Sequence, residues 1–318
     1  MAEEEKTEET LIEFDLSEQA NQAVEYLEIS DPKALKAVNE YFRLLINELK
    51  AFDIPGDKTA TYDVIFERAN QMTPVRDEVI KVITAVAKFE EQTKFYTELH
   101  SFFENLLPYF YFRNEGESNS RWAADHYIVF GSELFLYTVA ALLKHRKFEQ
   151  LNELTHQGYY IPSSKNVRTE RFILFNEFNR NSDALAEYYR NKQMREDYSK
   201  AAFLKERIIE NEFSYEDLAQ ADFILHLISL LDNRKSEQSF YDVWKNQLPT
   251  DIRAFELFVR SESLWFFQKF AKCLREVSKE NLTTFLEQYK KKIAESGMYY
   301  SRLDWEYKIA LDKIATRP

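Results

Sequence analysis

The chain has 318 residues, among them only 5 glycines but 26 phenylalanines and 19 tyrosines. Because glycine supplies the positive-φ positions of hairpins, tight turns and phosphate-binding loops, this composition disfavours most sheet architectures and nucleotide-cradling sites. A formal net charge of −12 argues against broad binding of duplex DNA, which depends on lysine and arginine neutralising phosphates.

The start of the chain divides into an acidic tail and a first helix. We expect residues 1–15 to form a disordered tail, because glutamate dominates the first positions and aromatic residues are absent from them. Asp31 followed by Pro32 is typical of a helix N-terminus, where the missing N–H of proline costs nothing. The pair predicts a helix that begins at Lys33 and ends near Phe52.

The next two predicted helices carry most of the apolar residues of the first half. Thr73 and Pro74 repeat the helix-start signature, and apolar positions keep a 3.6-residue period from there to Leu106. This pattern predicts one long helix, which Pro108 ends or kinks. The stretch 127–143 is apolar on nearly every face, so we expect it to be a central helix surrounded by others.

The second half of the chain follows a polar break at residues 157–168. Beyond this break, three positions predict helix starts. Ser182 and Ser278 are each followed by helix-forming sequence, and residues 214–217 resemble a capping box with aspartate where glutamate or glutamine is usual.

These features together predict an all-α protein of about a dozen helices with no significant sheet. We expect two packed helical halves, at residues 16–156 and 169–318, joined by a linker at 157–168. The arrangement is either an irregular helical bundle or a degenerate helical array, since no fixed repeat period is present.

The motifs of cofactor enzymes are absent from the sequence. It has no phosphate-binding loop, no dinucleotide fingerprint and no H-E-x-x-H zinc motif, so we expect no cofactor and no metal site. The single cysteine, Cys273, is interpreted as a small buried residue. Glu153 and His156 form one E-x-x-H unit, which we assign to an exposed helix face. Asp222 and His226 lie one helical turn apart and are interpreted as a polar pair within a helix interface.

Arg121 and His126 provide one catalytic hypothesis. They are separated by four residues at the start of the apolar helix, directly after a polar loop. This spacing resembles the R-x4-6-H motif of the HEPN ribonucleases, compact all-α proteins common in bacterial toxin and antiviral systems. The resemblance covers six residues and the helical context, and Trp122 stands where that family often has a polar residue.

The resemblance implies a metal-independent RNA endonuclease that works as a dimer. Two copies of the motif would face each other in one composite site. The Arg121 guanidinium would stabilise charge on the phosphate, and His126 would transfer the proton of a ribose 2′-hydroxyl.

Dense aromatic clusters indicate contact surfaces as well as core. Tyrosine and tryptophan are common in interfaces that contain some water, because the ring can be buried while its polar atom still forms a hydrogen bond. Core packing, a protein interface and stacking of unpaired bases are all open interpretations of these clusters. The candidate interaction residues are Tyr109, Tyr111, Tyr159, Tyr160, Trp265, Tyr299 and Tyr300.

The sequence favours a non-catalytic interaction or regulatory module that binds another protein or itself. The alternatives are the ribonuclease, which would bind RNA, and a helical sensor with a small ligand in a central cavity. We expect no membrane association, because the stretch 127–143 is short for a span and contains Glu133. An acidic N-terminus in place of a basic and then apolar leader predicts a cytoplasmic location.

Overall fold

The structure is a computed structural model that describes most of the chain. The described residues are 15–54, 59–89, 93–111, 122–163, 170–192, 199–209, 212–233, 253–295 and 309–318, together with Trp244 and Leu248. Within them the chain forms 13 α-helices and one two-stranded sheet, which confirms the all-α fold class.

The elements follow one another with short connections. The first seven helices are α1 (Ser17–Glu28), α2 (Ala34–Glu48), α3 (Tyr62–Gln71), α4 (Thr73–Lys88), α5 (Thr93–Leu106), α6 (Asp125–Lys144) and α7 (Phe148–His156). The strands β1 (Tyr159–Ile161) and β2 (Arg171–Ile173) come next. The remaining helices are α8 (Asp183–Asn191), α9 (Ser199–Lys205), α10 (Tyr215–Asn233), α11 (Glu256–Arg260), α12 (Leu264–Phe270) and α13 (Lys279–Glu295). Short 3₁₀ helices are η1 (Leu49–Phe52), η2 (Leu107–Tyr111), η3 (Phe175–Asn179) and η6 (Leu311–Lys313).

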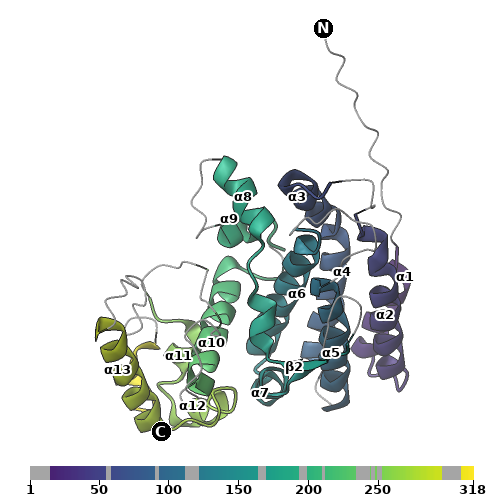
Figure 1. The fold of residues 1–318 in the computed structure, drawn as a ribbon. Coiled ribbons are helices and arrows are strands. Elements are labelled where there is room, and N and C mark those ends of the chain that lie inside the picture. The colour runs from purple at the N-terminus through teal and green to yellow at the C-terminus, as the bar shows by residue number, and fades with distance from the viewer. Residues whose placement is uncertain are drawn as a thin grey trace.

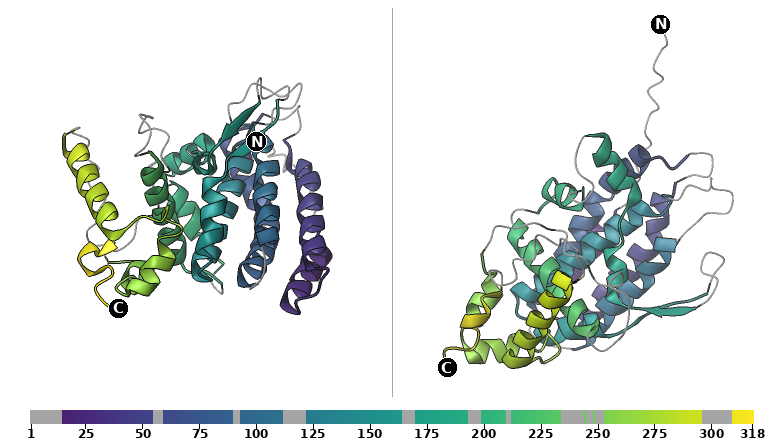
Figure 2. Two further views of the ribbon diagram at one scale, coloured as in Figure 1. Left: turned by 90° about the horizontal axis from the view of Figure 1, so that it is seen from below. Right: turned by 60° about the vertical axis from the view of Figure 1, so that its left-hand side comes forward.

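The long helices lie in a row that broadly follows the order of the chain (Figures 1 and 2). Helices α1, α2, α4 and α5 are at one end of the row, α6 is in the middle, and α10–α13 are at the other end. α6 packs against α4 on one side and against α10 on the other. One continuous hydrophobic core extends from Leu16 to Ile314, so the two predicted halves share the same core.

The central helix α6 has no exposed face. Every residue from Asp125 to Leu143 is buried, as the apolar stretch at 127–143 predicts. Among the described helices, α6 alone is long and apolar enough to cross a membrane, and its whole apolar window lies inside the protein. Gly131 allows the ring of Phe110 in η2 to lie against the backbone of α6. A Cβ atom at position 131 would be only 2.5 Å from Cζ of Phe110.

Three predicted helix starts are confirmed. The Ser182 hydroxyl accepts the backbone N–H of Leu185 at 3.0 Å, at the start of α8. At the start of α10, Ser214 and Asp217 form a capping box in which each side chain accepts the backbone N–H of the other, at 3.1 and 2.8 Å. Ser278 accepts an N–H of the first turn of α13 at 3.2 Å. These polar caps satisfy donors that a helix leaves unpaired.

The long helix predicted for residues 73–106 is wrong, because the structure contains two helices there, α4 and α5. Phe89 ends α4 in an extended conformation, with ψ of 130°. Its carbonyl accepts a hydrogen bond from Nζ of Lys147 at 2.8 Å, and its ring packs edge-on against Phe95 with centroids 5.2 Å apart. These tertiary contacts outweigh the helical period of the apolar residues.

The linker predicted at 157–168 contains one strand of a small antiparallel hairpin. β1 pairs with β2, so that Tyr160 is opposite Phe172. Helix α5 covers the outer edge of β1, where the backbone N–H of Tyr160 donates to Oε2 of Glu104 at 2.7 Å. Strands of three residues are too short to show an alternating apolar pattern, which is why the sequence did not reveal them.

Polar side chains of α10 bind Trp244 and Leu248. The Asp222 carboxylate accepts the indole N–H of Trp244 at 2.7 Å and the backbone N–H of Leu248 at 2.9 Å. Ser229 accepts the backbone N–H of Trp244 at 3.0 Å, and Nδ1 of His226 contacts the Trp244 carbonyl. Asp222 and His226 are therefore buried at a packed interface, as expected, with the non-helical residues Trp244 and Leu248 as the partners shown; their pairing with each other stays a prediction.

A buried ionic cluster surrounds Glu133 at the centre of α6. Arg76 of α4 donates from Nη1 to Oε1 of Glu133 at 2.9 Å, and Nη2 of Arg207, just after α9, lies 3.2 Å from Oε2. All three side chains are almost entirely buried. Arg76 also donates to the Arg207 carbonyl at 2.8 Å and to Asp77, so the cluster is linked by hydrogen bonds as well as charge.

This cluster connects three parts of the chain that are distant in sequence. Burial lowers the pKa of Arg207, and the nearby Glu133 offsets part of this effect. Arginine nevertheless stays protonated in proteins, so the carboxylate of Glu133 faces two guanidinium cations. A carboxylate inside an otherwise apolar helix is tolerated only when paired in this way.

Replacing Glu133 by Gln should strongly destabilise the protein. The amide would leave Arg76 and Arg207 as buried charges with too little compensation, and breaking such a pair typically costs about 3–5 kcal/mol. Urea unfolding followed by circular dichroism measures this loss of unfolding free energy. The matched control is Glu40→Gln, which removes an exposed ion pair with Arg43 and should leave the unfolding free energy unchanged within error. Equal effects of the two substitutions would contradict a stabilising role of the cluster.

Candidate functional site

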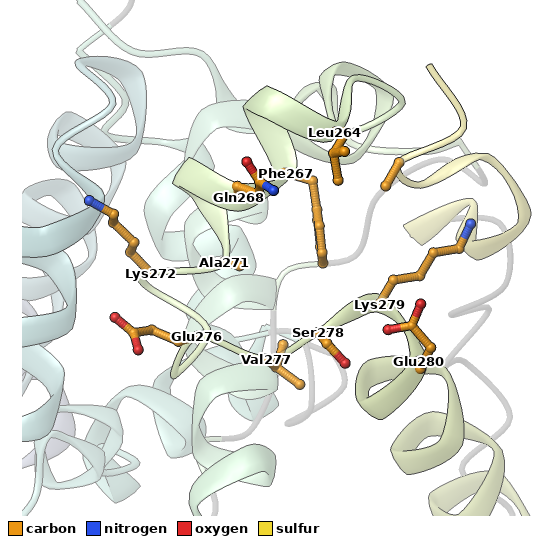
Figure 3. Close-up of a pocket in the computed structure, with 11 residues that line it drawn as sticks. Leu264, Phe267, Gln268, Ala271, Lys272, Glu276, Val277, Ser278, Lys279 and Glu280 are labelled. Carbon is orange, nitrogen blue, oxygen red and sulfur yellow. The ribbon is translucent and has the colours of Figure 1, made fainter. Parts of the chain in front are cut away.

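A cleft lies between α12 and α13, with a volume of about 530 Å³ (Figure 3). Its apolar lining consists of Leu264, Phe267, Ala271, Val277 and Ala315. Its polar lining consists of Gln268, Lys272, Glu276, Ser278, Lys279 and Glu280. Phe267 points from α12 into the space between the helices, whereas Lys279 and Glu280 stand at the start of α13. The cleft therefore combines an apolar floor with charges of both signs on its rim.

Local hydrogen bonds fix the α12 wall of this cleft. The Ser263 hydroxyl caps α12, and the N–H of Leu264 donates to the carbonyl of Arg317 at 2.8 Å. The N–H of Ala315 donates to the carbonyl of Ser261 at 2.7 Å. These two hydrogen bonds join residues 315–317 to the turn between α11 and α12. The side chains on this wall consequently project from a well-defined backbone.

Helices α11 and α12 carry three exposed apolar side chains, one of which, Leu264, also lines the cleft. Val259 of α11 is 50% exposed, and Leu264 and Trp265 of α12 are 44% and 58% exposed. We name these three residues the α11–α12 patch. Nζ of Lys269 lies 3.9 Å from the centre of the Trp265 ring, a cation–π contact that orients the indole without covering it. Leu264 belongs both to the patch and to the cleft, so the two surfaces are continuous.

The sequence contains a signal for this patch. Residues 264–267 are four consecutive apolar positions in a helix, and consecutive helical residues point in different directions. They cannot all face one core. Phe266 and Phe267 are buried, which leaves Leu264 and Trp265 toward solvent.

Two of the predicted interaction residues lie in the core instead of on the surface. The hydroxyl of Tyr109 donates to the backbone carbonyl of Ile46 at 2.6 Å. The hydroxyl of Tyr159 donates to the backbone carbonyl of Leu154 at 2.7 Å. Because each polar tip finds a backbone acceptor inside the protein, the whole ring is buried.

The other predicted interaction residues are distributed over different parts of the molecule. Tyr111 and Tyr160 are partly exposed near the β-hairpin, and Trp265 is in the α11–α12 patch. Tyr299 and Tyr300 lie outside the described residues. The described part of the set therefore does not form a single surface.

The structure places His126 in the interior and does not describe Arg121. The imidazole of His126 has no exposed surface, and burial lowers its pKa to about 3, with the charge of Arg68 acting in the same direction and a backbone contact with Phe52 opposing it. The ring is therefore neutral at physiological pH. In this conformation it is covered on all sides and has no access to an RNA 2′-hydroxyl.

Asp125, the neighbour of His126, has a structural role that the sequence did not suggest. Its Oδ2 accepts the hydroxyl hydrogen of Ser182 at 2.9 Å and the backbone N–H of Ala184 at 2.8 Å. The carboxylate at the start of α6 thus caps the start of α8. Burial raises the pKa of Asp125 to about 6, against the opposing effect of these hydrogen bonds. No local sequence pattern marks such a contact between residues so far apart in the chain.

Neither metal-binding clusters nor related proteins point to a chemistry. Among the described residues, no group of three or more His, Cys, Asp or Glu is arranged to hold a metal ion. Cys273 is buried, and this burial raises the pKa of its thiol. No protein-family model, no curated protein and no solved structure matches the chain.

The buried carboxyl of Asp125 predicts a pH dependence of stability. Its pKa of about 6 in the folded protein is higher than the ordinary value of 3.8, so the folded state binds more protons than the unfolded state between these values. The contribution of Asp125 to stability should therefore fall as the pH rises from about 4 to about 7. Urea unfolding at several pH values should show this loss for the wild type relative to Asp125→Asn. Parallel pH profiles of the two proteins would contradict the assignment.

Proposed function

We propose that this protein is a non-catalytic interaction module that binds another protein through the α11–α12 patch and the adjoining cleft. The single observation that carries the proposal is the exposure of Trp265 and Leu264 on the capped helix α12, together with that of Val259 on the preceding helix α11. Exposed aromatic side chains on a rigid support are typical of the residues that dominate binding energy in protein interfaces.

The chemistry of the cleft supports a protein partner. A volume of about 530 Å³ accommodates one or two large apolar side chains, and its apolar floor would remove them from water. Lys279 and Glu280 on the rim can pair with charges of either sign. We therefore propose that the partner inserts an apolar side chain into the cleft and packs a second one against Trp265.

The ribonuclease is the less favoured alternative. It requires His126 to reach a 2′-hydroxyl and to change its protonation state near neutral pH. A fully buried imidazole with a pKa of about 3 meets neither requirement in this conformation. This favours the non-catalytic proposal.

Site-specific photo-crosslinking in the native cell tests the proposed surface. With p-benzoylphenylalanine in place of Trp265, we expect one discrete covalent adduct with another protein. The same photo-reactive residue in place of Glu40, an exposed position on α2 far from the patch, should not yield that adduct. Adding Val259→Lys to the position-265 variant should reduce the adduct about tenfold or more, because a charge would be buried in the interface.

Two results would contradict this proposal. One is that the adducts from positions 265 and 40 are the same. The other is that Val259→Lys leaves the adduct unchanged while circular dichroism shows that the protein is folded.

An RNA digestion assay separates the two functions. Incubation of the wild-type protein with total RNA in EDTA should leave the RNA intact, because the His126 ring is inaccessible. Cleavage that is lost in a folded His126→Asn variant would overturn the non-catalytic proposal and support the ribonuclease.

A further inference from the structure

Among the described residues, one edge of the β-hairpin is covered and the other is open. β1 lies next to α5, which covers its outer edge, and β2 lies on the far side of β1. Figure 2 shows the hairpin projecting beyond the helices. Phe172, the central residue of β2, is 76% exposed, the largest value among the exposed large apolar residues of the described chain. Such an apolar edge strand is a template for pairing with another strand.

The hydrogen-bonding direction of Phe172 follows from that of Tyr160. The two residues are directly opposite in an antiparallel pair. The N–H of Tyr160 donates to Glu104, so it points away from β2. In antiparallel sheets, opposite residues either exchange both bonds or both point their N–H and C=O groups outward. The N–H and C=O of Phe172 therefore point away from β1, toward the open edge.

The two neighbours of Phe172 serve the hairpin itself. Arg171 is opposite Ile161 and Ile173 is opposite Tyr159, so these pairs form the internal bonds of the hairpin. The described residues provide no hydrogen bond to the outward groups of Phe172. Its ring lies on the same face as the ring of Tyr160, with centroids 5.2 Å apart.

Among the described charged residues near β2, Arg171 has no carboxylate partner. Glu104 and Glu170 both accept hydrogen bonds from Tyr160, and Glu177 forms an ion pair with Arg180. The guanidinium of Arg171 instead lies 4.3 Å from the centre of the Tyr111 ring, and it makes no ion pair within the described parts of the chain. Arg171 is exposed and directly precedes Phe172 on the open strand.

We propose that β2 binds an extended peptide segment of a partner protein by strand addition, and that Arg171 selects an acidic residue in that segment. The outward N–H and C=O of Phe172 would exchange hydrogen bonds with one residue of the added strand. That residue places an apolar side chain beside Phe172. Its neighbour, on the opposite face of the strand, lies next to Arg171 and carries the carboxylate. This surface is separate from the α11–α12 patch and does not depend on it.

A short synthetic peptide tests this inference. The probe is acetyl-Thr-Glu-Val-Glu-Thr-amide, in which an antiparallel strand with valine opposite Phe172 places a glutamate beside Arg171. Titration into the full-length protein should perturb the NMR signals of Arg171 and Phe172. Methylation of the central valine nitrogen removes one donor, and replacement of both glutamates by lysine removes the charge match. Each change should weaken binding about tenfold.

Matched protein variants separate backbone pairing from side-chain contact. Phe172→Pro removes the outward N–H as well as the ring, and proline is tolerated at an edge position whose N–H faces solvent. Phe172→Ala removes the ring alone. The proline variant should bind the probe about fivefold more weakly than the alanine variant, with equal circular dichroism spectra. Arg171→Glu should reverse the preference to the lysine peptide, whereas Trp265→Ala should leave probe binding unchanged.

Three outcomes would overturn the inference. They are equal binding by the proline and alanine variants, equal binding of the N-methylated probe, and an unchanged charge preference in Arg171→Glu. Dimerisation of the wild type that is abolished in Phe172→Pro, seen by analytical ultracentrifugation, would also overturn it, because a second copy would then occupy the edge.

Discussion

The fold depends on the neutralisation of Glu133 inside a helix that has no exposed face. A charged carboxylate in the centre of α6 is strongly unfavourable unless cations are held against it. Arg76 approaches from α4 and Arg207 from the segment after α9, at 2.9 and 3.2 Å. The positions of α4 and of the segment after α9 against α6 therefore depend on charge as well as on apolar packing. An apolar contact alone would allow the helices to slide, whereas the directed hydrogen bond from Arg76 and the ion pair with Arg207 favour one register.

Aromatic packing extends this fixed centre toward both ends of the molecule. The ring of Phe135 in α6 stacks on that of Phe178, with centroids 4.5 Å apart, and its centroid lies 5.9 Å from that of Trp244. The indole N–H of Trp244 in turn donates a hydrogen bond to Asp222 of α10. The same core thus continues from the central helix to the second half of the chain. Such a continuous core supports the proposed surfaces in two different regions, the α11–α12 patch and the open edge of β2. Neither proposal requires α6 itself to take part in binding.

Local features were predictable from the sequence, and contacts between distant residues were not. Caps such as Ser182 depend on neighbours a few positions away, and the apolar stretch of α6 indicates burial by composition. The break at Phe89 involves Lys147, and the second acceptor at the start of α8 is Asp125 of α6, which binds the N–H of Ala184 in addition to the Ser182 cap. The aromatic clusters could not be assigned to core or surface in advance, because core and interface use the same side chains. Only the structure distinguishes them.

The central claim is that the chain has one cooperative core, held across α6 by the Glu133 cluster. Native-state hydrogen exchange with increasing denaturant tests it most directly, because it reports the opening free energy of each helix separately. The account predicts that amides in the middle of α4, α6 and α10 converge on the same opening free energy, which equals that of global unfolding. Exchange of α10 through an opening of clearly lower free energy, while α4 and α6 stay protected, would contradict it. The two halves would then be independent units.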